Sequence, residues 1–306
     1  MSRYLVQRLQ HLAWVLFAVS LLVFLLIYLS GDPATLLAPL DAKPEDVARI
    51  RQLYGLDQPI LVQYWRFLVQ AVQGDLGESF RYHQPALTLV LQKLPATVQL
   101  ALFSLGLTVL VGIPLGVLAG TRPNSLVDWI ASLITFVGIS IPSFWLGILL
   151  ILAFADRLRW LPSSGAGTWR HLLLPGITLS LYSIGLVSRL VRSTLIDVLQ
   201  HDYIRTARAK GLGERLVLYR HALRNTLIPT VTVLGLQLGG LLGGSVVVES
   251  VFAWPGVGWL MLQGIQNRDL PLVRAVVLVV GLAFVLINLT VDLIYTLIDP
   301  RIRHET

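Results

Sequence analysis

Uncharged apolar runs alternate with short charged segments along the chain, and these runs define its predicted architecture. The first run extends from Leu12 to Ser30 and follows a basic start with Arg3 and Arg8. Five further runs have the bounds 94–121, 129–155, 172–188, 225–248 and 275–291. A membrane-spanning helix needs roughly 20 predominantly apolar residues, which the two shorter runs reach with their flanks. We therefore predict an all-α integral membrane protein with six transmembrane helices, the first within residues 1–30.

The N-terminal pattern has an alternative interpretation, because a basic start before an apolar run is also typical of a secretory signal peptide. The run from Leu12 to Ser30 is longer than the apolar core of most signal peptides, and no A-x-A-like cleavage site follows it. We therefore expect a retained first span with a cytoplasmic N-terminus.

Residues 31–93 differ in kind from the apolar runs on either side. They mix acidic and basic residues, contain five prolines and lack an apolar run of span length. Pro44 opens one short helical pattern, and a second amphipathic helix with an aromatic face is predicted from Leu61 to Val72. Such an aromatic face is typical of a membrane interface. We expect a periplasmic segment with amphipathic helices.

Residues 197–224 form a strongly basic interruption in the second half of the chain. From Arg189 to Arg224, eight basic residues oppose three acidic ones, so the local charge is +5 within a net charge of +7. Apolar residues recur at helical spacing on both sides of Gly211, which predicts two short amphipathic helices hinged at residues 211–213. Because basic residues collect on the cytoplasmic side of spans, we place this segment inside the cell. Six spans then put both termini, including the tail 298–306, in the cytoplasm.

Composition supports the membrane assignment. Only 13% of the residues are charged and 55% are hydrophobic, whereas soluble proteins carry roughly a quarter charged residues. A basic balance in a soluble chain would suggest nucleic acid, but no nucleic-acid motif is present and the positive-inside rule explains the excess. We expect membrane lipids, and no nucleic acid, among the partners.

The sequence offers little support for enzymatic chemistry. It has no cysteine, no phosphate-binding G-x-x-x-x-G-K-[ST] motif and no histidine pair with metal-ligand spacing, so we expect no catalytic site and no metal. Proton-driven carriers usually keep an ionisable residue in the bilayer, and the nearest approach is Asp292 beside Asn288. A translocation pathway driven by a separate motor fits better, with Pro114, Pro142 and Pro229 as bends. A stand-alone secondary carrier or channel is the alternative of another class.

The basic segment contains a specific set of residues: Asp202, Tyr203, Arg205, Thr206, Ala207, Arg208, Ala209, Lys210, Gly211, Arg220, His221, Asn225 and Pro229. This set resembles the ATPase-coupling motif of ABC importer permeases, in the form found in the peptide and nickel group. The general pattern of the motif is E-A-A-x-x-x-G. Here Arg205-Thr206-Ala207 takes the first three places, so the acid and one alanine are not kept.

Further matches to the same family follow the order of the chain and cover nearly all of it. They are Gly31-Asp32-Pro33, Gly55-Leu56-Asp57-Gln58-Pro59, Gly74-Asp75-Leu76-Gly77, Leu94-Pro95-Ala96-Thr97, the stretch 249–258, Asn267-Arg268-Asp269 and the stretch 299–303. The resemblance implies a type I ABC importer permease fold with its core over 94–297, in a bacterial inner membrane.

The resemblance also implies the partners and the cofactors. The partners would be a second homologous permease subunit, two cytoplasmic ABC ATPase subunits and a periplasmic or lipid-anchored solute-binding protein. ATP and Mg would be bound by the ATPase subunits and not by this chain. Residues Tyr203 to Gly211 would lie in a cleft on an ATPase, where Ala207 and Gly211 would permit close approach and the arginines would pair with acidic groups.

Two further expectations concern the outer side and the solute. Glu249, Trp254, Pro255 and Gly256 form a possible outer gate, although Glu249 could instead be an interfacial carboxylate solvated by headgroups. The segment 31–93 is expected to contact the binding protein or to cover the entrance. By resemblance, the solute is a peptide or peptide-like compound (dipeptide, oligopeptide or glutathione), with nickel or a metal chelate as the alternative. The short outer loop 156–171 fits glutathione-type and nickel-type relatives.

Overall fold

The computed structural model describes residues 2–29, 34–35, 43–53 and 55–298, and in these ranges the regular secondary structure is helical, with one isolated bridge between Glu78 and Pro85 in a connecting segment. It divides into two compact units, described separately here: residues 1–95 with 256–286, and residues 96–255 with 287–306. The matches at 31–33 and 299–303, and the tail after Ile298, lie outside the described residues.

The first unit is built from α1 (Ser2–Leu29), α3 (Pro44–Leu53), α4 (Ile60–Val72), the start of α5 (Ala86–Leu107), α13 (Val257–Gln266) and most of α14 (Leu270–Ile298). Its core gathers apolar side chains of α5, α13 and α14: Ala86, Leu89, Val90, Val257, Leu260, Leu272, Ala275 and Val276. Asp269 is buried before α14, where it accepts hydrogen bonds from the Ser79 hydroxyl and the Leu272 N–H. These bonds fix the segment before α5 on the start of α14.

The aromatic face predicted for α4 is divided between protein and surroundings. Tyr64 and Phe67 pack on Phe24 of α1, with ring centroids 5.2 and 6.1 Å from that ring, and the Tyr64 hydroxyl lies 2.8 Å from the Ser20 hydroxyl. Trp65 points away and is 68% exposed. The face therefore serves helix packing first, and within it only Trp65 is placed to meet a membrane interface.

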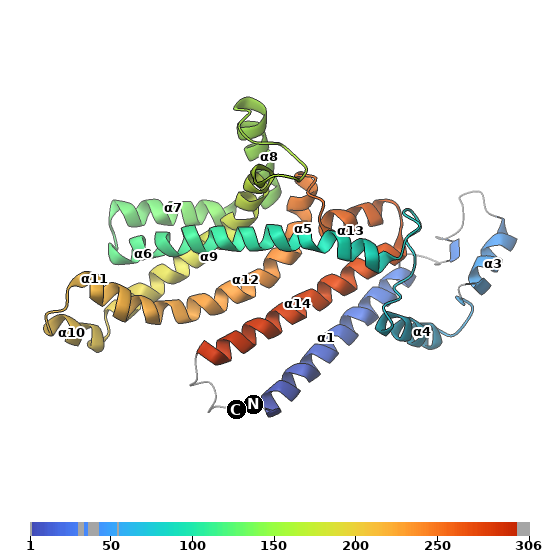
Figure 1. The fold of residues 1–306 in the computed structure, drawn as a ribbon, viewed down its shortest axis with the longest axis horizontal. Coiled ribbons are helices and arrows are strands. Elements are labelled where there is room, and N and C mark those ends of the chain that lie inside the picture. The colour runs from blue at the N-terminus through green and yellow to red at the C-terminus, as the bar shows by residue number, and fades with distance from the viewer. Residues whose placement is uncertain (1, 30–33, 36–42, 54, 299–306) are drawn as a thin grey trace. The chain divides into compact units, whose positions relative to one another are not determined.

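The second unit surrounds α9 (Trp169–Leu199), whose interior-facing residues are buried along most of its length. The rest of the unit follows in chain order: the remainder of α5, the π-helical turn η1 (Thr108–Gly112), α6 (Ile113–Thr121), α7 (Leu126–Ser140), α8 (Ser143–Leu150), the π-helical turn η2 (Ile151–Arg157), α10 (Asp202–Ala209), α11 (Glu214–Leu216), the π-helical turn η3 (Val217–Ala222), α12 (Leu223–Val251) and the end of α14. α6, α7 and α12 pack along α9 (Figure 1).

Glycines bring α6 and α7 against the backbone of α9. A Cβ built on Gly116 would lie 2.6 Å from the Ser188 carbonyl oxygen, and one on Gly138 would lie 2.8 Å from that of Leu181. On α9 itself, a Cβ on Gly185 would lie 2.9 Å from the Thr135 carbonyl oxygen of α7. We call these three residues the glycine seam. Small residues of this kind allow the close backbone approach on which helix association in lipid depends.

Four helical stretches in the described chain are long and apolar enough to cross a membrane: Ala86–Thr121, Trp169–Leu199, Glu214–Val251 and Leu270–Val291. α7 and α8–η2 together make a fifth, bent by 107°. The described apolar part of α1, Ala13–Leu25, is shorter than a span. The all-helical membrane architecture is therefore confirmed, while the count of six spans stays a prediction.

The third apolar run is interrupted at the proline that was predicted as a bend. Residues 129–155 were expected to form one span bent at Pro142, and in the structure α7 ends at Ser140 and α8 begins at Ser143. Pro142 has no N–H to donate to the Gly138 carbonyl, and Ile141 before it is extended, with φ −85° and ψ 124°. The predicted span is thus a bent pair of helices.

Candidate functional site

The motif found in the sequence forms a compact turn between α9 and α12, here called the coupling segment (residues 200–225). α9 ends at Leu199, α10 runs from Asp202 to Ala209, and α11 begins at Glu214. The buried side chains of α10 are Ile204 and Ala207, which pack with Leu195 and Val198 of α9 and with Val217 and Ala222 of η3. The coupling segment is therefore anchored on the ends of two span-length helices (Figure 1).

Gly211 makes the turn after α10. Its φ is +78°, in the left-handed region that side chains other than glycine rarely adopt, and its N–H donates to the Arg208 carbonyl at 2.9 Å. A Cβ on Gly211 would meet no atom within 4 Å, so backbone conformation and not space requires glycine here. Gly213 has an ordinary φ of −63°. The hinge predicted at residues 211–213 is present, and its special conformation belongs to Gly211.

The second of the two predicted short helices does not exist as a separate element. α11, η3 and α12 form one helical stretch from Glu214 to Val251. No proline or glycine interrupts the chain between Gly213 and Pro229, so helix formation continues from the turn directly into the span. The helix entering the fifth predicted span therefore begins at Glu214 and not near Asn225.

The outer face of the coupling segment carries charge and few internal ion pairs. The Arg208 guanidinium donates to Glu214 across the turn, at 2.7 and 3.2 Å, and Arg205 lies 3.5 Å from Asp202. The Asn225 amide donates to the Tyr203 hydroxyl at 2.8 Å, which holds α10 on the start of α12. Four exposed cations have no carboxylate partner in the described part of the chain: Lys210, Arg215, Arg220 and Arg224.

The structure divides the predicted motif residues between this outer face and the interior. The exposed members are Asp202, Tyr203, Arg205, Thr206, Arg208, Ala209, Lys210, Gly211, Arg220 and Asn225. His221 is half-buried, and Pro229 lies half-buried within α12. Ala207 is only 6% exposed, because it faces the chain's own core. The expectation that Ala207 permits close approach of an ATPase is therefore wrong, since its small side chain serves internal packing.

The predicted outer gate lies where α12 ends. Glu249 is fully buried and accepts a hydrogen bond from the Thr97 hydroxyl of α5 at 2.7 Å. Trp254 is also buried, and its indole N–H donates to the Ala96 carbonyl at 2.9 Å. Pro255 follows, and Gly256 precedes the first residue of α13. Because the protein encloses the Glu249 side chain, the alternative of an interfacial carboxylate solvated by headgroups is wrong.

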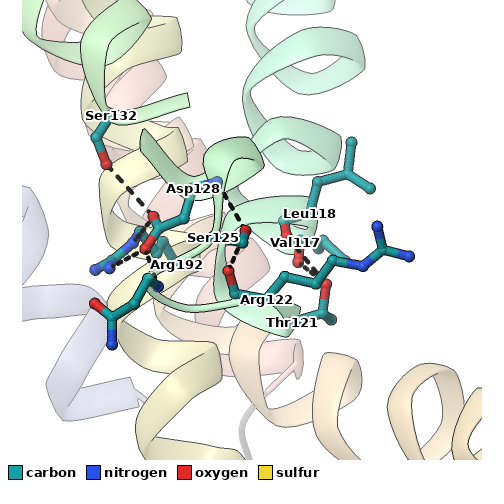
Figure 2. Close-up of polar contacts among 9 residues, drawn as sticks. Val117, Leu118, Thr121, Arg122, Ser125, Asp128, Ser132 and Arg192 are labelled. Atoms are coloured by element: carbon teal, nitrogen blue, oxygen red, sulfur yellow. Dashed lines mark hydrogen bonds and ion pairs between the residues drawn. The ribbon is translucent and has the colours of Figure 1, made fainter. Parts of the chain in front are cut away.

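A partly buried ion pair that sequence reasoning missed joins α7 to α9 near the other end of the unit. Figure 2 shows Asp128, in the first turn of α7, facing Arg192 of α9, whose Nε and Nη2 donate to its two oxygens at 2.5 and 2.7 Å. Asp128 Oδ2 also accepts from the Asn124 N–H at 2.9 Å. The Asp128 side chain is only 6% exposed. The sequence does hold a signal for this pair: an acidic residue ends the loop 121–128, and a basic residue lies near the end of α9.

A hollow lies beside the bend between α7 and α8. Its volume is about 370 Å³, and it is lined by residues 138–143 and by Thr178 and Tyr182 of α9. Ser140, Ser143, Thr178 and Tyr182 are among its lining residues, and the hollow lies where the helical backbone of a predicted span is broken. No group of His, Asp and Glu side chains in the described residues is arranged to hold a metal ion.

Comparison with known proteins extends the picture over the whole chain. Residues 112–304 match the family described as binding-protein-dependent transport system inner membrane component, and residues 1–101 match its N-terminal family. The chain is 44% identical over 306 residues, its full length and theirs, to the glutathione transport system permease protein GsiC of Escherichia coli O6:H1, and 43% identical to that of Escherichia coli K12. The GsiC protein of Salmonella paratyphi A is also 43% identical over the same length.

Solved structures agree on the fold. The inward-facing MetNI methionine ABC transporter matches with a TM-score of 0.58 and 22% identity, over 69% of this chain and 96% of that one. An amino acid ABC transporter matches with a TM-score of 0.51 and 16% identity, over 70% of this chain and 94% of that one. Both are helical transporter structures, which places the present helices in an established membrane fold.

Proposed function

The chain belongs to the binding-protein-dependent transport system inner membrane component family and is an importer permease, and from this premise we propose that it admits a peptide-like solute, with glutathione as the first candidate. Full-length identity of 44% to a glutathione permease supports that choice of solute. The short outer loop 156–171, which fits glutathione-type and nickel-type relatives alike, leaves a nickel chelate as the alternative solute.

We propose that the coupling segment is the handle on which a cytoplasmic ATPase acts. The observation that carries this proposal is the division of α10 into two faces. Ile204 and Ala207 fasten the helix to two long helices, while the opposite face exposes Arg205 and Arg208 in surface ion pairs and is followed by Lys210, which has no carboxylate partner in the described chain. Charge-assisted bonds to an acidic cleft would satisfy those cations. Because the helix is anchored, force on its outer face would reach α9 and α12.

The proposal includes the remaining subunits and the orientation. A second permease subunit would complete the pathway, two ATPase subunits would bind ATP and Mg, and a solute-binding protein would deliver the solute. The basic coupling segment lies in the cytoplasm by the positive-inside rule, which places both termini there and residues 31–93 outside. Glu249 and Trp254, buried at the end of α12, would belong to the outer gate with Pro255 and Gly256.

The solute is tested by reconstituting the complete complex in liposomes with the binding protein outside and ATP inside. Uptake of labelled glutathione that requires both ATP and the binding protein is the expected result. The same vesicles are offered a dipeptide and a nickel chelate, so that selective uptake of either would redirect the assignment. Glutathione uptake by the permease pair without its ATPases would replace the importer by a stand-alone carrier.

The docking role is tested separately, by measuring how tightly the ATPases bind the permease pair in nanodiscs. The double variant Arg205→Gln with Lys210→Gln removes two exposed cations and should weaken ATPase binding roughly tenfold. This corresponds to a loss of about 1.4 kcal/mol in binding free energy. Arg122→Gln, another exposed arginine predicted to be cytoplasmic, is the matched control and should bind normally. Equal binding by all three proteins would contradict docking through α10.

A further inference from the structure

The ion pair between Asp128 and Arg192 lies on the path from the coupling segment to the bend of α7. Arg192 belongs to the last turns of α9, and α10 begins three residues after that helix ends. Asp128 belongs to the first turn of α7, whose other end lines part of the hollow. From Asp128 to Gly138 the helix covers about 15 Å at 1.5 Å per residue. α9 leads from the coupling segment to the hollow, which it lines with Thr178 and Tyr182, and the pair ties α7 to this same helix.

We propose that Asp128 and Arg192 are positioning residues that make α7 move with α9, so that a displacement of the coupling segment reaches the bend between α7 and α8. The inference rests on the proposed docking role of α10. It assigns these two side chains a task in coupling that is distinct from binding solute or ATPase.

The ion pair adds a directional contact to the packing of the two helices. The glycine seam brings α7 and α9 into close backbone contact, which favours one register because larger side chains would not fit at these positions. A bidentate bond between a guanidinium and a carboxylate restricts the register further, because both pairs of atoms must stay aligned. One turn of sliding, about 5.4 Å, would break both bonds. The pair therefore adds a polar restraint to the register that the seam favours.

The surroundings of Asp128 hold its carboxylate ready for Arg192. Ser125 caps α7 by accepting from the Asp128 N–H at 3.3 Å, and its hydroxyl donates to the Arg122 carbonyl at 2.6 Å (Figure 2). The Asn124 N–H and the more distant Ser132 hydroxyl, at 3.4 Å, donate to the carboxylate oxygens. The loop from α6, the start of α7 and α9 thus meet at one side chain.

The experiment measures a distance, so that it does not depend on the solute. The chain has no cysteine, so labels at Phe136→Cys on α7 and Gln200→Cys at the end of α9 are unique within it. Both residues are exposed in this chain. In the full complex, the spin-label distance should be the same in the nucleotide-free and vanadate-trapped states. If this distance changes between the two states while Asp128 and Arg192 are both intact, the proposal is overturned without any further variant.

Removing the pair should release α7. With Asp128→Ala, the distance distribution should widen and its mean should differ between the two states by about 1–2 Å or more. Transport per ATP hydrolysed, measured with glutathione as the probe, should fall roughly 3- to 30-fold while ATPase binding persists. Ser132→Ala, which removes only the longest of the contacts to the Asp128 carboxylate, should leave the spin-label distances and the transport per ATP hydrolysed unchanged.

Conservative variants separate positioning from folding. Arg192→Lys keeps the charge and one contact, and should recover part of the coupling ratio that Arg192→Gln loses. If both assemble and couple equally well, the charge pair has no positioning role. If Asp128→Ala fails to assemble, the Arg192→Lys and Arg192→Gln variants, together with the spin-label distances measured with the ion pair intact, still decide the question. If the chain with its ion pair and coupling segment intact does not bind the ATPases, the docking proposal is refuted instead. That result is distinct from a failure of the ion-pair proposal.

Discussion

Two arginine–carboxylate pairs of the same chemistry sit in opposite surroundings in this protein. Arg192 and Asp128 meet within the helix bundle, and the Asp128 side chain is 6% exposed. Arg208 and Glu214 meet across the turn of the coupling segment, where Glu214 is 70% exposed. Water and salt weaken the second pair far more than the first. The first is suited to fixing helices in register, whereas the second leaves the Arg208 guanidinium accessible to a partner.

The same contrast applies to glycine. In the glycine seam, the hydrogen of Gly116 leaves room for a carbonyl of α9, so the requirement is for space. At Gly211 there is open space, and the requirement is for a left-handed backbone. The interior uses glycine to bring helices together, and the coupling segment uses it to turn the chain.

The largest effect is expected from filling the seam. In Gly116→Val, the new Cβ would lie 2.6 Å from a backbone carbonyl of α9, so the two helices would have to separate. We expect a loss of about 3 kcal/mol or more in stability, read as a fall in the thermal midpoint of the detergent-solubilised complex. Gly106→Ala, where a Cβ meets nothing within 4 Å, is the control. Equal midpoints for both variants would mean that α6 and α9 do not pack as described.

The next effect compares the two ion pairs directly. Asp128→Ala leaves the Arg192 guanidinium without its carboxylate partner, and because that side chain is about one third exposed we expect a cost of about 1–3 kcal/mol. Glu214→Ala should cost about 0.5 kcal/mol or less, since the pair is exposed. Thermal midpoints at low and high salt measure both. A larger loss for Glu214→Ala would reverse the comparison.

A smaller stability effect should come from the turn itself. Gly211→Ala places a side chain at a φ of +78°, which costs about 1 kcal/mol, whereas Gly213→Ala at −63° should cost almost nothing. Because the strain lies in the coupling segment, Gly211→Ala should also lower transport per ATP, and the bulkier Gly211→Trp should lower it further while insertion persists. Normal transport by Gly211→Trp would count against the coupling role.

The smallest structural effect concerns the Asn225 bond that holds α10 on α12. Asn225→Ala removes its donor to the Tyr203 hydroxyl, and both groups stay solvated, so the expected loss of stability is about 0.5 kcal/mol. Hydrogen exchange of the α10 amides should rise all the same, because this bond limits local opening of the segment. Tyr203→Phe is the matched variant and should give the same rise. Unchanged exchange in both would show that the apolar contacts of Ile204 and Ala207 hold α10 without this bond.

Much of the site could be predicted because the relevant signals are local. The charge excess between Arg189 and Arg224 and the helical spacing before Gly211 located the coupling segment. The same local reading gave the wrong partner for Ala207, because it could not tell which face of α10 the chain covers. Ile204 and Ala207 turn inward only because Val217 and Ala222 come back beside them after the turn.

The apolar runs and the glycine turn were thus determined by the sequence itself, since hydrophobicity and backbone conformation depend on neighbouring residues. Tertiary structure alone decided that Asp128 meets Arg192, 64 residues further on, and that Glu249 is enclosed against Thr97, 152 residues away. It also decided how far the chain bends at Pro142, a residue the sequence could mark only as a possible break. These outcomes depend on which helices pack together, because a polar side chain is satisfied only by a partner that the fold brings within hydrogen-bonding distance.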